Sequence, residues 1–143
     1  MYKTSEAARP IGMPRHTLMS WLDRRVVELG GGDVDEGSSG VPRLLSMPRV
    51  VQIAIAHEMT KLGLNPTRAA EAAALFTDKS QPGRATGRPF TTGRTLLVVS
   101  ATATEVINAP HAEPSNFGAS IVVDCGATVE RIDRALSPKR RAA

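Results

Sequence analysis

The first quarter of the chain places apolar residues at the spacing of an α-helix, and the pattern breaks once, around a glycine. Thr4 or Ser5 suits the cap of a first helix, because a hydroxyl oxygen can accept from the first unpaired N–H groups. Pro10 is predicted to end this helix. Pro14 begins a second helix, since a proline in the first turn leaves no needed N–H unpaired.

Three residues stand in the order that a helix-turn-helix requires. Ala8 is small enough for two helices to touch, Gly12 suits the tight turn, and Leu18 holds the second helix in the core. Trp21 and Leu22 continue that buried face, and Trp21 is the only tryptophan of the chain. The side chains left to point outward are basic or hydroxylated: Arg15, His16, Ser20 and Arg24.

Two short β-prone stretches follow, at residues 26–29 and 41–45, on either side of a glycine-rich loop with an acidic tip. Such a pair predicts a hairpin, which directly after a helix-turn-helix would be a wing. The acidic residues 33–37 do not fit a calcium loop, because Gly37 and Leu44 would fall on ligand positions. We expect a mobile wing tip instead.

Two more helices are predicted at residues 46–63 and 67–76, the second of them after a cap-like Asn65-Pro66 pair. Residues 78–94 are rich in Gly, Pro and polar side chains without periodicity, which predicts a flexible linker. Strands are then expected at 95–100, 104–107 and 120–125, followed by a closing helix at 127–136 and a frayed basic tail at 138–141.

These elements predict an α+β fold: a helical winged helix-turn-helix domain at 1–77, the linker at 78–94, and a small β-β-β-α segment with a basic tail at 95–143. The strand at 95–100 carries apolar residues on both faces and needs covering on both. A second copy of the chain can supply that cover, so a homodimer through the C-terminal half is expected.

Composition narrows the function classes. The 143 residues are 41% hydrophobic and 22% charged, as in an ordinary globular protein, and only 3% are aromatic, so the core rests on aliphatic residues. The formal charge is +4, yet residues 1–78 hold nine basic and nine acidic side chains, and the surplus lies beyond them. Charge segregation within the first half still allows an anionic partner.

The chain offers few groups for catalysis or metal binding. Cys125 is the single cysteine and follows a buried-type strand, so it is predicted to be a core residue. His16, His57 and His111 lie in separate elements without companion ligands, so no metal or cofactor is expected. The chain carries no phosphate-binding glycine loop, paired carboxylates or serine–histidine arrangement, and we expect no enzyme.

Location follows from the same sequence. The start at Met1 lacks a charged and apolar leader, and the apolar runs are too short to span a bilayer. We therefore expect no membrane association and a cytoplasmic, nucleoid-associated protein.

Residues 2–76 resemble the MerR-type winged helix-turn-helix regulators. The resemblance rests on Thr4–Ala8, Pro14–Leu18, Trp21, Gly40–Arg43 and Leu62–Leu64. The chain departs from that family where Met19 and Ser20 replace an arginine and a tyrosine, in its more acidic wing, and in a β-rich tail that replaces a long helix.

The resemblance implies a dimeric, bacterial-type transcriptional regulator that binds specific double-stranded DNA, with base contacts from the second helix and a phosphate contact from the wing arginine. Exposed arginines and lysines also suit phosphates. The expected DNA-binding residues are Arg15, His16, Thr17, Ser20, Arg24, Arg25, Arg43, Lys3 and Arg9. Two alternatives remain: an excisionase-like or architectural DNA-bending protein, and a protein-interaction module with a helix-turn-helix fold.

Overall fold

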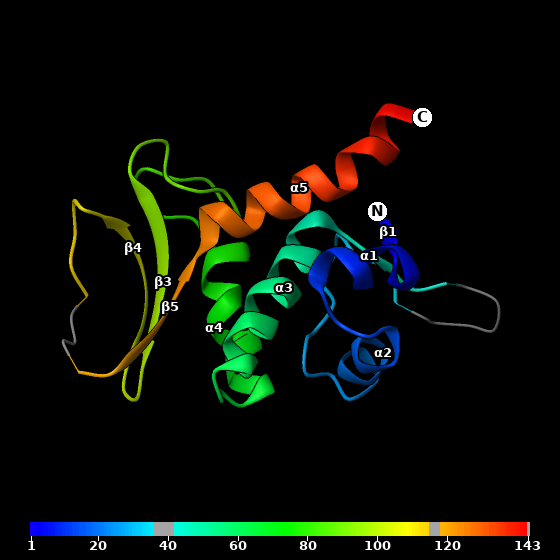
Figure 1. The fold of residues 1–143 in the computed structure, drawn as a ribbon, viewed down its shortest axis with the longest axis horizontal. Coiled ribbons are helices and arrows are strands. Elements are labelled where there is room, and N and C mark those ends of the chain that lie inside the picture. The colour runs from blue at the N-terminus through cyan, green and yellow to red at the C-terminus, as the bar shows by residue number, and fades with distance from the viewer. Residues whose placement is uncertain (36–41, 115–117, 143) are drawn as a thin grey trace.

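The computed structural model describes residues 1–35, 42–114 and 118–142 and shows an α+β fold (Figure 1). The helices are α1 (Thr4–Ile11), α2 (Arg15–Asp23), α3 (Met47–Lys61), α4 (Pro66–Thr77) and α5 (Cys125–Ala142). The strands are β1 (Tyr2–Lys3), β2 (Leu44–Leu45), β3 (Arg94–Ser100), β4 (Thr104–Ala109) and β5 (Ser120–Asp124). The predicted helices and the three C-terminal strands are confirmed, whereas the structure differs at residues 26–29, 78–94 and 138–141 and adds the short strand β1, which the sequence does not predict.

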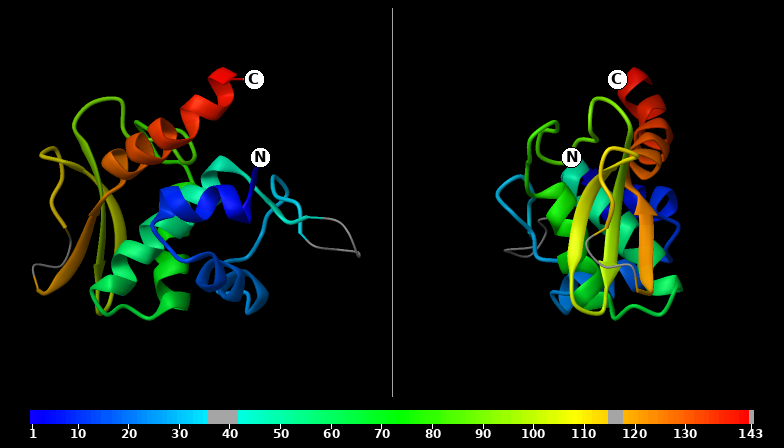
Figure 2. Two further views of the ribbon diagram at one scale, coloured as in Figure 1. Left: turned by 45° about the vertical axis from the view of Figure 1, so that its right-hand side comes forward. Right: turned by 90° about the vertical axis from the view of Figure 1, so that its left-hand side faces the viewer.

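The three C-terminal strands form an antiparallel sheet in the order β4-β3-β5 (Figure 2, right). β3 is central because it pairs with β4 across a short turn, as expected, and with β5 on its other side. The helices lie on one face of this sheet (Figure 1). A separate two-stranded ladder joins β1 to β2 near the N-terminus.

A single hydrophobic core runs through both halves of the chain. α3 lies at its centre, packed against α4, α1 and α5. Leu18, Ile53 and Phe76 from the N-terminal half are fully buried, as are Leu97 and Ile132 from the C-terminal half. An apolar helix such as α3 is stable only when other elements surround it. The β-rich segment therefore completes the core of the N-terminal helices.

Residues 78–94 differ from the predicted flexible linker, because they pack onto α4. Arg84 is only 6% exposed; it donates to the carbonyl oxygens of Leu75 and Phe76 at 3.1 and 3.0 Å. Its guanidinium also lies over the Phe76 ring, 4.9 Å from the centroid. Gly87 N–H donates to the same Phe76 carbonyl. The last carbonyl groups of α4 thus hold this segment in place.

The predicted strand at 26–29 is wrong. Arg25 has a left-handed φ of 55°, which ends α2 and turns the chain, and Val27 is buried in an irregular segment. The hairpin partner is further along, where Val34 and Leu44 form an isolated antiparallel bridge with two 2.8 Å bonds. Residues 36–41, which include most of the predicted wing tip, lie outside the described residues.

Two expectations for the C-terminal half also change. The tail predicted to fray at 138–141 continues the helix α5 to Ala142. The two-faced strand β3 is covered within one chain, because Leu97, Val98 and Val99 are each at most 3% exposed. A second copy is therefore not needed to cover β3.

Candidate nucleic-acid interface

The turn between α1 and α2 is built on Gly12. Its φ of +85° is left-handed, and its N–H donates to the carbonyls of Ala8 and Arg9 at 3.0 Å. Met13 N–H reaches back to the Ala8 carbonyl at 3.1 Å, which closes the helix end in the manner of a Schellman motif. Pro10 lies in the last turn of α1, and Pro14 caps α2. The turn thus fixes the direction in which α2 leaves α1.

α2 has the two faces that the sequence predicts. Leu18, Trp21 and Leu22 are buried against the core, at most 7% exposed. On the outer face, Arg15, His16 and Arg24 are exposed, whereas Thr17 and Ser20 are half-buried. A shallow depression of about 750 Å³ runs along this outer face. It is lined by Arg15, His16, Met19, Ser20, Asp23 and Arg24.

The depression therefore brings together four of the residues predicted to bind DNA, and two residues that sequence reasoning missed, Met19 and Asp23, line it as well. Met19 and Asp23 lie four residues apart on the helix, so their spacing alone places them on one face with Arg15. The exposed residues Lys3, Arg9 and Arg25 do not line the depression. Arg9 lines a different hollow, between α1 and α5.

Two side chains from distant elements hold the turn in place. His57 of α3 donates from Nε2 to the Gly12 carbonyl at 3.2 Å, and the edge of its ring meets Trp21 at a centroid distance of 6.5 Å. Arg131 of α5 donates to the Pro10 carbonyl. Burial, followed by the nearby Lys61 charge, lowers the pKa of His57 below 6.5. The neutral imidazole therefore supports the turn.

Arg43, predicted to contact phosphate from the wing, is engaged within the chain. Its guanidinium pairs with Asp23 at 3.0 Å and with Asp35 at 3.1 Å, and the Arg43 side chain is 10% exposed. Since Asp23 is the last residue of α2, this pair ties the bridge at Val34 and Leu44 to the end of that helix. It also neutralises Asp23, the carboxylate among the described residues that line the depression.

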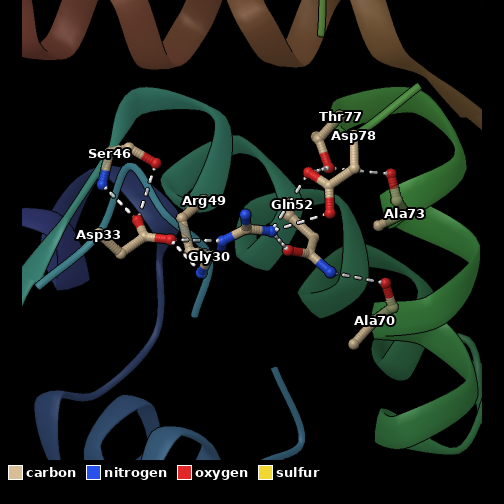
Figure 3. Close-up of polar contacts among 9 residues, drawn as sticks. All are labelled: Gly30, Asp33, Ser46, Arg49, Gln52, Ala70, Ala73, Thr77 and Asp78. Atoms are coloured by element: carbon tan, nitrogen blue, oxygen red, sulfur yellow. Dashed lines mark hydrogen bonds and ion pairs between the residues drawn. The ribbon is translucent and has the colours of Figure 1, made fainter. Parts of the chain in front are cut away.

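Asp33 does not belong to an exposed acidic tip. Its side chain is completely shielded from solvent and accepts four hydrogen bonds (Figure 3). The donors are Gly30 N–H at 2.8 Å, Ser46 N–H at 2.7 Å, Ser46 Oγ at 2.8 Å and Arg49 Nε at 3.1 Å. Burial alone raises the pKa of Asp33, but these hydrogen bonds outweigh it, so the pKa lies below 3.8.

Arg49 extends this buried polar cluster to α4. Its Nη1 pairs with Asp78 at 3.2 Å and also donates to Gln52. The Gln52 amide in turn donates to the Ala70 carbonyl at 2.8 Å (Figure 3). The cluster thus joins the segment before the Val34 bridge to the α3–α4 pair. Sequence reasoning missed it, although Arg49 and Gln52 are conspicuous polar residues in the apolar part of α3.

The remaining predicted features have simple structural positions. Cys125 is fully buried, as predicted for a core residue, and burial raises the pKa of its thiol to about 12. Across residues 1–35, 42–114 and 118–142, no three His, Cys, Asp or Glu side chains come close enough to hold a metal ion. In the same described parts, no helix is long and apolar enough to cross a membrane.

Comparison with protein-family models and with curated proteins finds no match to this chain.

Proposed function

We propose that this protein binds double-stranded DNA in a sequence-specific manner through the outer face of α2. The observation that carries the proposal is the division of α2 into a buried apolar face and an outer face lined by Arg15, His16, Ser20 and Arg24. An α-helix presented in this way fits the major groove, where basic and hydroxylated side chains contact base edges.

Each side chain of this face has a role suited to its chemistry. Arg15 lies at the first position of α2, and an arginine there can donate two hydrogen bonds to guanine. His16, Thr17 and Ser20 can donate to or accept from neighbouring base edges. Arg24, at the end of the helix, suits a phosphate.

The proposal changes the role assigned to Arg43. The Asp23 carboxylate lies on the same face as Arg24 and by itself would repel a phosphate backbone. Pairing with Arg43 at 3.0 Å removes much of that repulsion. We therefore assign Arg43 to neutralising Asp23 and fixing the adjacent chain, in place of a direct phosphate contact.

We further propose that the protein acts as a dimer in the cytoplasm. One copy of α2 makes few base contacts, so two copies on repeated half-sites provide the required affinity and specificity. The half-sites are expected to be separated by about one helical turn of DNA, or a multiple of it.

Selection of bound sites from a random duplex pool, followed by titration of the selected site at several salt concentrations, tests the proposal. Phosphate contacts make the logarithm of the binding constant fall by about 0.9 per contact for each unit of log salt. A recovered sequence motif with a steep salt dependence is expected. Failure to recover any motif at low salt overturns the proposal.

Three observations favour a second candidate function. The α2 face includes half-buried Met19 and the acidic Asp23, and residues 1–78 carry balanced charge, all of which suit a protein partner. If binding through the outer face of α2 does not change with salt concentration, the protein is a protein-interaction module. Regularly phased distortion across long footprints would identify the DNA-bending alternative.

A further inference from the structure

The two outer strands of the three-stranded sheet differ in how their edges are protected. On the β4 side, the Gln81 side chain donates to the Val106 carbonyl at 3.1 Å. Within the described residues, no backbone hydrogen bond from a loop or another strand reaches β5 from the side opposite β3. Figure 2 (right) shows β5 as the outermost strand on its side. An unpaired strand edge is a template for another strand.

β5 has little of the usual protection against such pairing beyond its short length and the charged Asp124 at its end. Its sequence, Ser-Ile-Val-Val-Asp, contains no lysine, proline or glycine, and its three central residues are β-branched. Val122, the middle residue, is 52% exposed. β5 is therefore a short strand with high β-propensity and an available edge.

A groove of about 530 Å³ runs beside this edge, between β5, the end of α3 and the start of α5. Leu62, 68% exposed, lies on the α3 side of the groove, and Val122 lies on the β5 side. Apart from Met1, these are the large hydrophobic residues most exposed in the described parts of the chain. The groove thus combines a hydrogen-bonding strand edge with the solvent-exposed Leu62 side chain, whereas Val122 alternates with buried Val123 and projects from the opposite face of the sheet.

The charges that line the groove are balanced. Glu58 and Asp124 are acidic, and Lys61 and Arg131 are basic. The two carboxylates disfavour a nucleic acid, and the balance gives no preference for a strongly charged peptide. Glu58 pairs with Lys61 at 3.3 Å and Asp124 with Arg94 at 3.0 Å within the chain. A two-fold copy of β5 instead complements the strand itself, because it sets β-branched residues opposite β-branched residues about Val122.

We propose that two copies of this chain associate through the edges of β5, antiparallel, about a two-fold axis beside Val122. In that register Ser120 lies opposite Asp124 of the second copy, and Ile121 lies opposite Val123. The two sheets join into one sheet of six strands, and Leu62 borders the new pair on the helix side of that sheet. This inference rests on the proposed function for its biological purpose, since it supplies the regulator's dimer, but its test uses no DNA.

Cross-linking through a single introduced thiol tests the register. The native Cys125 is buried, so a thiol at an exposed position is the reactive one. Directly opposed strand residues have Cα atoms about 4.5–5.5 Å apart, within reach of a disulfide or a short bifunctional reagent. Val122→Cys is expected to give a covalent dimer at low micromolar protein. Ala112→Cys, an exposed alanine beyond β4, is the matched control and is expected to remain monomeric.

Mass measurement in solution tests the association itself. Light scattering of the full chain at tens of micromolar is expected to give twice the 15.2 kDa chain mass. Val122→Lys, which places like charges together at the axis, is expected to give monomers, and Leu62→Ser to weaken the dimer. Ala112→Lys adds the same charge elsewhere and is expected to leave the dimer intact, while circular dichroism checks that each variant folds.

Three outcomes overturn the inference: a wild-type monomer at this concentration, a dimer that survives Val122→Lys, or equal cross-linking at positions 112 and 122. A wild-type monomer that nevertheless gains mass on binding an extended peptide assigns the groove to a different partner and also overturns it. A dimer without DNA binding leaves the inference standing and removes the proposed function. A monomer that binds the selected DNA overturns the inference and leaves the proposed function standing.

Discussion

Asp33 and Arg49 form an ion pair, with Nε and Oδ2 3.1 Å apart, in which 0% of the Asp33 side chain and 9% of the Arg49 side chain are exposed. The pair joins the segment that leads to the Val34–Leu44 bridge to the first turn of α3. Since α3 is the centre of the core, this contact sets the position of the bridge relative to α2. The same pair governs an expected loss of stability in acid.

Asp33→Asn is expected to lower the free energy of unfolding by about 1.5–3 kcal/mol, because Arg49 loses one buried carboxylate partner while Asp78 remains. Urea denaturation measures the change. Glu130→Gln is the matched control, since it removes a carboxylate from the exposed pair with Arg134 and is expected to change stability by less than about 1 kcal/mol. Equal effects of the two substitutions would contradict the structural role of Asp33.

The pH dependence of stability follows from the same carboxylate. The pKa of Asp33 is lower in the folded protein than the unfolded value of 3.8, so its ionised form favours folding. Its contribution is full above pH 3.8 and is lost as the pH falls below 3.8 through the folded pKa. Asp33→Asn is expected to flatten this part of the stability profile, and Glu130→Gln is not.

The lowered pKa of His57 predicts a second pH dependence of stability, at higher pH than that of Asp33. Burial and Lys61 keep the folded pKa of His57 below 6.5, so near that pH the unfolded chain binds more protons than the folded one. Stability is therefore expected to be full above pH 6.5 and to decrease as the pH falls through 6.5 toward the folded pKa. The dependence should disappear in His57→Gln but persist in His111→Gln, whose side chain is exposed. Thermal unfolding at a series of pH values measures both.

Gly12 gives a direct test of the turn between α1 and α2. A methyl group there would meet no atom within 4 Å, so the effect of Gly12→Ala comes from the left-handed φ of +85° alone. We expect destabilisation by about 1–2 kcal/mol. Gly31→Ala is the control, because that glycine also has open space around it and lacks a left-handed φ. If the two variants have equal unfolding free energies, the turn does not have the described geometry.

The helices and the three-stranded sheet could be predicted because their signals are local. Helical spacing, the Asn65 cap and the β-branched strands each act over a few residues, and Asn65 indeed accepts hydrogen bonds from Thr67 and Arg68 N–H. The two faces of α2 could be predicted in the same way, because Leu18 and Trp21 alone fix which side is buried.

The errors occur where contacts between distant residues decide the structure. The sequence predicts Asp33 in an acidic loop because its neighbours are acidic, whereas its partner Arg49 lies 16 residues away. Residues 78–94 have the composition of a linker, yet the Arg84 guanidinium donates to the Phe76 carbonyl near the end of α4. Tertiary contacts of this kind leave no periodic pattern in the sequence.

The outer face of α2 yields the prediction that tests the proposed function most directly. Arg15→Ala is expected to weaken binding to the selected DNA site by about 1–3 kcal/mol and to relax the preference at one base pair, because one base-contacting side chain is lost. Arg24→Ala, which removes a phosphate contact, is expected to weaken binding to all DNA sequences alike and to reduce the slope of the salt dependence by about one unit.

Arg88→Ala removes the same charge from an exposed position outside the α2 face and is the matched control. Fluorescence anisotropy with matched and mismatched duplexes measures all three variants. If Arg15→Ala behaves like Arg88→Ala, α2 does not contact the bases; if all three bind as the wild type does, the outer face of α2 does not contact DNA.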